Sequence, residues 1–244
     1  MTSKRAILLF TRSIASEIKA KRLSGLSYAQ CQQVYRWLIQ TAIAVSQQTH
    51  AALVIATDKA APEFIGATHF LIQRGTTFHD RLCAAVEDTL AIGYEEVVII
   101  GNDSPDLTAD TLEQAFEALE THALAFGAAL DGGLYLIGLQ RTSLPLLNTL
   151  LASCRWQTQF VQEDLQCSLR ALKQTAAWLP PLVDIDDSTS LLHYAQASHL
   201  DMLCRLATLL SQAQVNENDY SYQTLPSVLI PRLRHQKAPP YLFI

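Results

Sequence analysis

The sequence lacks the cysteine patterns that mark disulfide scaffolds and zinc sites. Its five cysteines are odd in number and form no CxxC pair: Cys31, Cys83, Cys154, Cys167 and Cys204. Cys31, Cys83 and Cys204 lie in apolar helical patterns, so we expect buried free thiols. Free thiols predict a reducing, cytoplasmic location for the protein.

Long apolar runs are also missing. No stretch approaches the roughly 20 consecutive apolar residues that a membrane helix needs. Only five apolar residues follow Arg5, which is too short for the apolar segment of a signal peptide. The sequence therefore predicts no membrane partner and no secretion.

Strong positive charge and several catalytic motifs are absent as well. The net charge is −5 and no basic run is long enough for a nucleic-acid patch, so no nucleic-acid partner is expected. The seven histidines show no HExxH spacing, which argues against zinc hydrolysis, and no GxSxG elbow occurs. The glycine fingerprints of Walker and Rossmann phosphate loops are missing too.

What is present is the composition of a globular protein. The chain has 244 residues, of which 49% are hydrophobic and 17% charged, and it shows no internal repeat. A chain of this length can bury a substantial core. We therefore expect one large domain, or a domain with an extension.

Residues 97–100 (Val-Val-Ile-Ile) predict a strand that is buried on both faces, because these apolar residues show no polar alternation. The strand runs directly into Gly101-Asn-Asp-Ser-Pro-Asp106, which places carboxylates at its carboxyl end. In open α/β sheets, ligands bind beyond that end of the strands. Asp103 is therefore a candidate for metal or substrate contact.

The order of apolar patterns predicts an α/β fold. Strands are expected at 6–10, 51–56, 68–72 and 97–100. Helices are expected between them at 31–43 and 78–92, and a polar loop at 11–22. Such alternation implies right-handed crossovers and a doubly wound, mostly parallel sheet with helices on both faces, a three-layer α/β/α arrangement.

The pattern changes in the second half of the chain. Apolar runs at 123–130 and 134–139 are joined only by Asp131-Gly132-Gly133, which predicts a hairpin or a tight reversal of the chain. Beyond it we expect a helix at 157–172, a strand at 176–179 and a helix at 188–199. The sheet is therefore expected to be mixed.

Three acidic clusters end apolar runs: Asp103/Asp106, Asp131 and Asp184/Asp186/Asp187. Mg²⁺ is usually held by one or two carboxylates together with substrate phosphates and water. A cation there would neutralise a diphosphate leaving group during nucleotidyl or glycosyl transfer. Aspartates after strands also form turns and cap helices, which is the competing interpretation for each cluster.

Basic residues follow the first expected strand, namely Arg12, Lys19, Lys21 and Arg22. Cations at this edge of a sheet suit phosphate, and arginine can contact it through two hydrogen bonds. Basic residues beside a helix start are also often only solvated, so both interpretations stay open.

Gln73, Gly75 and Arg81 form a second polar set after the third expected strand. Arg81 either reaches back over the edge of the sheet or pairs with Asp80 or Glu87. The residue pattern alone does not choose between these arrangements.

Three segments together resemble a known family: residues 73–82 (QRGTTFHDRL), 100–107 (IGNDSPDL) and 131–139 (DGGLYLIGL). In this order and spacing they resemble bacterial GT-A-type, glycosyltransferase-like proteins, the nucleotide-diphospho-sugar transferases. Val183-Asp-Ile-Asp186 resembles the closing element of that family, so the resemblance covers about residues 5–200. More distantly, the arrangement is similar to phospholactate guanylyltransferase and the molybdenum-cofactor guanylyltransferases.

The resemblance implies a GT-A domain over residues 1–200 that binds a nucleotide or nucleotide-sugar and uses Mg²⁺ or Mn²⁺. Asp103 and Asp186 would hold the metal, and Asp131 would orient the acceptor or act as base. Gly132 and Gly133 would line the acceptor side. The expected substrate-binding set is completed by Arg12, Lys21, Arg22, Gln73, Gly75 and Arg81.

The first loop departs from the family pattern. Residues 12–23 contain no proline or glycine, and they include Glu17, which the family does not lead us to expect. A second hypothesis follows, in which a diverged GT-A fold serves as a nucleotide-binding or assembly module without catalysis.

The C-terminal segment differs from the rest of the chain. Residues 216–244 contain four prolines and end in Tyr-Leu-Phe-Ile. We expect residues 201–244 to be an extension that packs on the domain or on a partner subunit, which makes a homodimer one candidate assembly.

Overall fold

A computed structural model describes residues 4–197, in which strands and helices alternate along most of the chain. The strands are β1 (Arg5–Phe10), β2 (Ala52–Thr57), β3 (His69–Ile72), β4 (Glu96–Ile100), β5 (Leu124–Ala129), β6 (Leu134–Gln140) and β7 (Ala177–Leu182). The helices are α1 (Ile14–Ala20), α2 (Tyr28–Ser46), α3 (Phe78–Ile92), α4 (Ala109–Leu119), α5 (Leu144–Leu151), α6 (Val161–Ala171) and α7 (Ser188–Ala197), with short 3-10 turns η1 (Pro62–Phe64) and η2 (Arg141–Ser143). None of the helices in this part of the chain is long and apolar enough to cross a membrane.

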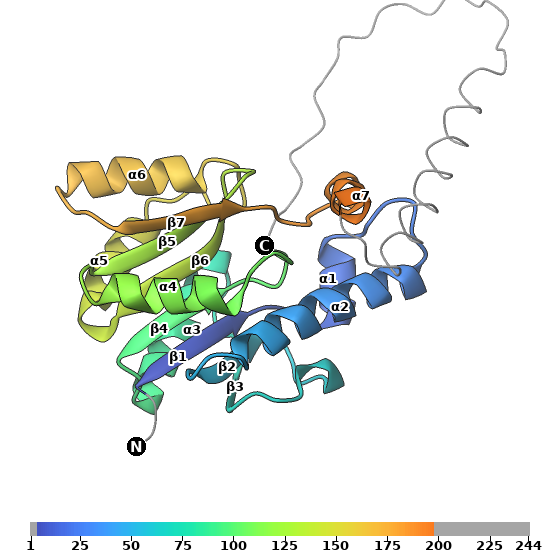
Figure 1. The fold of residues 1–244 in the computed structure, drawn as a ribbon, viewed down its shortest axis with the longest axis horizontal. Coiled ribbons are helices and arrows are strands. Elements are labelled where there is room, and N and C mark those ends of the chain that lie inside the picture. The colour runs from blue at the N-terminus through green and yellow to red at the C-terminus, as the bar shows by residue number, and fades with distance from the viewer. Residues whose placement is uncertain (1–3, 198–244) are drawn as a thin grey trace, which may run out of the picture.

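The strands form one mixed sheet in the order β3-β2-β1-β4-β6-β5-β7 (Figure 1). Parallel pairs join β1 to β2 and β4, β2 to β3, and β5 to β7. Strand β6 runs antiparallel to both β4 and β5. The predicted α/β fold with a mostly parallel, mixed sheet is therefore confirmed, and the predicted hairpin is the β5–β6 pair.

Helices cover both faces of the sheet and give the predicted three layers (Figure 1). Helices α1, α2, α4 and α7 pack on one face, and α3, α5 and α6 pack on the other. Along β4, Val98 and Ile100 face the first layer, whereas Val97 and Ile99 face the second. This double burial explains why the strand shows no polar alternation.

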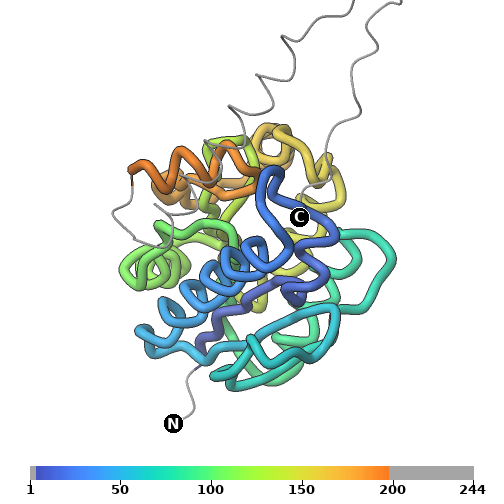
Figure 2. Tube along the Cα trace, turned by 90° about the vertical axis from the view of Figure 1, so that its right-hand side faces the viewer, coloured from blue at the N-terminus to red at the C-terminus, as the bar shows by residue number. Residues whose placement is uncertain are grey.

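Three loops leave the sheet at the same edge. Ile100 at the end of β4 pairs with Leu136 near the start of β6, and Ala129 pairs with Leu182 at the ends of β5 and β7. The segments 101–107, 130–133 and 183–187 are therefore neighbours. Figure 2 shows α7 beside the loop that follows α1, where the Ser188 hydroxyl donates to the Ser24 carbonyl at 2.6 Å.

The structure differs from the predicted elements in the first loop, where α1 replaces part of the expected polar loop. Ile14 and Ile18 lie one turn apart on this helix and are buried, as is Glu17 between them. A two-turn helix offers too few repeats for its apolar period to stand out in sequence.

The second half of the fold shows two further differences. Helix α6 begins at Val161 and not at the predicted residue 157, since Gln157 has φ +64°, outside the range of a right-handed helix. Helix α5 was not expected at all. The predicted extension at 201–244 lies outside the described residues.

Candidate active site

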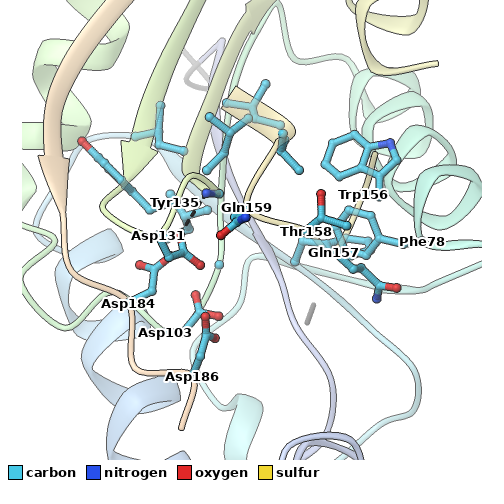
Figure 3. Close-up of a pocket in the computed structure, with 18 of the residues that line it drawn as sticks. Phe78, Asp103, Asp131, Tyr135, Trp156, Gln157, Thr158, Gln159, Asp184 and Asp186 are labelled. Carbon is cyan, nitrogen blue, oxygen red and sulfur yellow. Dashed lines mark hydrogen bonds between the residues drawn. The ribbon is translucent and has the colours of Figure 1, made fainter. Parts of the chain in front are cut away.

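A pocket of about 400 Å³ lies at the carboxyl edge of the sheet, where the loops after β4 and β7 meet the β5–β6 turn (Figure 3). Its acidic end is lined by carboxylates from these loops: Asp103, Asp131, Asp184 and Asp186. At the other end lie Phe78 and Trp156, whose ring centroids are 4.9 Å apart. The pocket therefore offers one ligand both a charged region and an aromatic region.

Asp103 is held in place by the loop that follows β4. Its backbone carbonyl accepts a hydrogen bond from the Ile185 N–H at 2.8 Å. The neighbouring Asn102 side chain is buried and accepts a hydrogen bond from the Thr11 hydroxyl at 3.2 Å. These bonds join the ends of β1 and β4 to the segment after β7, and they bring Asp103 close to Asp186.

Lys21 lies between Asp103 and Asp186. Its ammonium nitrogen is 3.1 Å from Oδ2 of Asp103 and 2.5 Å from Oδ1 of Asp186. The Lys21 side chain is only 4% exposed, and the two carboxylate side chains are 12% and 16% exposed. Charge-assisted hydrogen bonds of this kind are among the strong ones in proteins, so the ammonium joins the two loops firmly.

The acidic end is poorly solvated for the charge it carries. Burial and the neighbouring Asp103 carboxylate raise the pKa of Asp184 well above its usual range. Burial raises the pKa of Asp186 to about 6, although Lys21 acts in the opposite direction. Burial lowers the pKa of Lys21, but Asp103 and Asp186 outweigh it and raise that pKa, so the ammonium stays charged. Carboxyl groups perturbed in this way inside a pocket are typical of functional sites.

Asp131 lies in the turn between β5 and β6 and is exposed at the pocket. Its Oδ1 accepts the N–H of Gly133 at 2.8 Å. Gly132 has φ +92°, a left-handed conformation that favours glycine, and its carbonyl accepts the Gln162 N–H at 3.0 Å. The turn thus presents Asp131 to the pocket while it packs against the segment that leads into α6.

The backbone N–H groups at the start of the first loop donate hydrogen bonds to carboxylates of the same chain. Three consecutive N–H groups donate in this way: Arg12 to Glu17 at 3.3 Å, Ser13 to Asp58 at 2.7 Å and Ile14 to Glu63 at 2.9 Å. Backbone N–H groups at a helix start are common donors to bound phosphate. Here all three donate within the chain.

A family model for uncharacterised proteins conserved in bacteria (DUF2064) matches residues 29–158, which is more than half of the chain. The chain belongs to this family. The match runs from α2 to the segment beside Trp156 and includes the loops that carry Asp103 and Asp131. A search of curated proteins gives no significant match to the sequence.

Solved structures place this DUF2064 member among nucleotide-diphospho-sugar transferase folds. A candidate nucleotide-diphospho-sugar transferase from Desulfovibrio desulfuricans G20 is similar, with a TM-score of 0.69 and 22% identity over 89% of this chain and 98% of that one. The CTP complex of CMP:2-keto-3-deoxy-manno-octonic acid synthetase gives a TM-score of 0.52 and 14% identity over 81% and 100%. The manganese complex of Rv0371C from Mycobacterium tuberculosis H37Rv gives a TM-score of 0.51 and 10% identity, over 80% of this chain and 99% of that one. At these identities the similarity establishes the fold and confirms that part of the prediction.

The structure brings only part of the predicted site to the pocket of this DUF2064 member. The predicted residues that line it are Lys21, Asp103, Asp131, Gly133 and Asp186, and Gly132 lies in the adjoining turn. The remaining predicted residues are not among the described residues that line it: Arg12, Arg22, Gln73, Gly75 and Arg81.

Two of these remaining residues make contacts elsewhere in the fold. Gln73 donates from Nε2 to the Thr11 carbonyl at 2.8 Å, so it ties two strand ends together. Arg81 donates to the Thr76 carbonyl at 3.2 Å, which differs from both arrangements considered for it. The role of the five residues in binding substrate stays a prediction.

Phe78 and Trp156 received no role from the sequence, and Asp184 was named only as a member of an acidic cluster. Asp184 had a usable signal, because residues that alternate along an extended segment share one face, and Asp186 was already a candidate. Phe78 and Trp156 are brought together only by the packing of α3 against the segment before α6. No local pattern links two residues so far apart in the chain.

A divalent cation held jointly by Asp103 and Asp186 does not fit this arrangement of side chains. The Lys21 ammonium is already within hydrogen-bond distance of both carboxylates. Within residues 4–197, no group of three or more His, Cys, Asp or Glu residues is arranged to hold a metal. The use of Mg²⁺ or Mn²⁺ stays a prediction, and the position of Lys21 argues against it.

Proposed function

We propose that the protein is a transferase that acts on a nucleotide or a nucleotide-diphospho-sugar, by glycosyl or nucleotidyl transfer. The observation that carries the proposal is the pocket itself, where carboxylates from three loops and the Lys21 ammonium face one space. Ligands of open α/β sheets bind at this edge. The same fold in a synthetase complexed with CTP supports a nucleotide as the ligand.

The two ends of the pocket would bind different parts of the substrate. At the acidic end, Lys21 would contact a phosphate oxygen while Asp103 and Asp186 keep its side chain in place. Asp131, exposed at the pocket, would orient an acceptor hydroxyl or take up its proton as general base. Phe78 and Trp156 would pack against a planar or apolar part of the substrate.

Nucleotide binding is expected to raise the melting temperature of the wild-type protein by roughly 5–10 °C at a hundredfold excess over Kd, since binding to the folded state adds about 2.7 kcal/mol of stability. Asp103→Asn is expected to remove most of that shift, because the neutral amide no longer holds the Lys21 ammonium as firmly. Differential scanning fluorimetry with nucleoside diphosphates, triphosphates and nucleotide-sugars measures both.

Asp106→Asn is the matched control for Asp103→Asn. Asp106 lies in the same loop, but it is exposed and accepts a hydrogen bond from the Tyr194 hydroxyl at 2.9 Å. This variant is expected to keep the full shift. A wild-type protein that shows no shift with any nucleotide or nucleotide-sugar would contradict the proposal.

The closed first loop favours a second function, a diverged GT-A fold that binds a nucleotide or a partner without catalysis. The carboxylates of Glu17, Asp58 and Glu63 accept the N–H groups that a phosphate would otherwise use. The Ser16 hydroxyl also donates to Asp58 at 2.6 Å. Although burial opposes it, the hydrogen bonds from Ser13 and Ser16 lower the pKa of Asp58, so this carboxylate stays ionised in the loop.

Asp58→Ala tests whether the closed loop limits binding. Removing this carboxylate frees the Ser13 N–H, so nucleotide affinity is expected to rise by about tenfold, which corresponds to one charge-assisted hydrogen bond. Isothermal titration calorimetry measures the change, and Asp88→Ala, which removes a surface partner of Arg74, is the control. Binding without consumption of any nucleotide or nucleotide-sugar would favour the second function over transfer.

A further inference from the structure

We propose that Lys21 is the resident cation of this site, and that its ammonium occupies the place between Asp103 and Asp186 that a divalent metal would take. The pocket then binds its ligand without a divalent ion on these two carboxylates. This inference concerns the carboxylates and the lysine alone, so it does not depend on a nucleotide being the ligand.

The Lys21 ammonium is shared by two largely buried carboxylates, which distinguishes it from a surface ion pair. One nitrogen lies within hydrogen-bond distance of carboxylates from two different loops, the loop after β4 and the segment after β7. All three side chains are at most 16% exposed. Exposed ion pairs contribute little because water screens them, but water has little access to this one.

The backbone of Lys21 is fixed at the end of α1. Its N–H donates to the Glu17 carbonyl at 2.7 Å, and its own carbonyl accepts a hydrogen bond from the Tyr35 hydroxyl. Tyr35 is itself buried in α2. The Lys21 backbone is therefore held in one position, and its aliphatic side chain is buried. Together these constraints place the ammonium beside the two carboxylates.

The ammonium and a metal ion exclude each other at this pair. A divalent cation binds carboxylate oxygens at roughly 2.0–2.6 Å, in the space that the Lys21 nitrogen fills. Two like charges at such close range in a water-poor site repel each other strongly. A metal could bind Asp103 and Asp186 together only if the ammonium left a position in which it is buried and doubly paired.

The test is a Mn²⁺ titration of the full-length protein in which free Mn²⁺ is followed by electron paramagnetic resonance. Lys21→Met removes the charge and keeps an apolar stem, so it is expected to bind one Mn²⁺ about tenfold or more tightly than wild type, because affinity follows the charge of the ligand set. Lys19→Met is the matched control, since Lys19 lies in the last turn of α1, two residues before Lys21, and is exposed. It is expected to bind Mn²⁺ as wild type does.

A second variant assigns the new site. Adding Asp103→Asn to Lys21→Met is expected to abolish the gain in Mn²⁺ affinity. A wild-type protein that binds Mn²⁺ as tightly as Lys21→Met would overturn the proposal, and so would a folded Lys21→Met with no gain. If Lys21→Met does not fold, the comparison of Mn²⁺ binding by wild type and by Asp103→Asn tests the proposal. A wild-type Mn²⁺ site that Asp103→Asn removes overturns the proposal, whereas equally weak binding by both supports it.

Discussion

Replacing Gly132 with alanine is expected to lower the free energy of unfolding by about 3 kcal/mol or more, from backbone strain and overpacking together. A non-glycine residue is strained at the φ of +92° found here. A Cβ atom at this position would lie 2.1 Å from the Gln159 carbonyl oxygen and 2.9 Å from its carbon. Backbone atoms cannot rotate away, so the segment before α6 must move. Urea denaturation measures the loss.

The same substitution is expected to weaken ligand binding. Gln159 belongs to the segment that lines the pocket beside Trp156, and Asp131 lies on the other side of Gly132. A shift of the Gln159 backbone therefore changes the distance between Asp131 and the pocket wall. Any ligand that raises the melting temperature of wild type should raise that of the variant less.

Gly93→Ala separates strain from the steric clash. Gly93 ends α3 with φ +123°, but a Cβ atom there would have no neighbour within 4 Å. Its substitution is expected to lower the free energy of unfolding by only about 1–2 kcal/mol, because alanine is strained in the left-handed conformation. Equal losses for the two variants would show that the Gln159 carbonyl moves aside freely, and that the turn does not brace the pocket.

Sequence patterns predicted the fold well because burial on both faces leaves a clear trace in each central strand. The run at 97–100 shows no polar alternation, and the structure places its side chains in both helical layers. The link Asp131-Gly132-Gly133 likewise predicted the β5–β6 hairpin, because so short a connection cannot carry a crossover. Periodicity missed α1 and α5, which are short, and it placed the start of α6 too early in the chain.

The candidate site was less accessible to sequence analysis because its contacts join distant segments. The edge of the sheet where carboxylates gather followed from strand direction, so Asp103, Asp131 and Asp186 could be named. The direction of a single long side chain could not be predicted. Lys21 was assigned to phosphate as one of several basic residues. Its ammonium reaches Asp103 and Asp186 only because of the direction of α1 and the hydrogen bonds that fix the Lys21 backbone at the end of this helix.

Lys21→Met is expected to destabilise the protein by about 3 kcal/mol at pH 7.5, the lower end of the range for breaking a buried ion pair. The loss is expected to shrink as the pH falls through 6 and to be small near pH 4. Asp184 and Asp186 have pKa values raised above their usual range, that of Asp186 to about 6. Ionising such groups therefore costs the folded state stability as the pH rises, and Lys21 offsets that cost.

The sign of this dependence follows from the two kinds of group. The pKa of Lys21 is raised, so its ammonium is present in both wild-type states throughout pH 4–8 and does not itself titrate there. The carboxyl groups of Asp184 and Asp186 set the dependence, because their raised pKa values make them protonated near pH 4. The folded state then holds fewer anions that the ammonium neutralises, and the cost of burying the ammonium is less well offset. Urea denaturation of Lys21→Met and wild type at pH 4, 6 and 7.5 measures the difference. Lys19→Met, which changes an exposed charge, is expected to differ from wild type by less than about 0.5 kcal/mol at each pH. A loss in Lys21→Met that stays constant across this range would assign the effect to packing of the stem, and would leave the ammonium without a structural role.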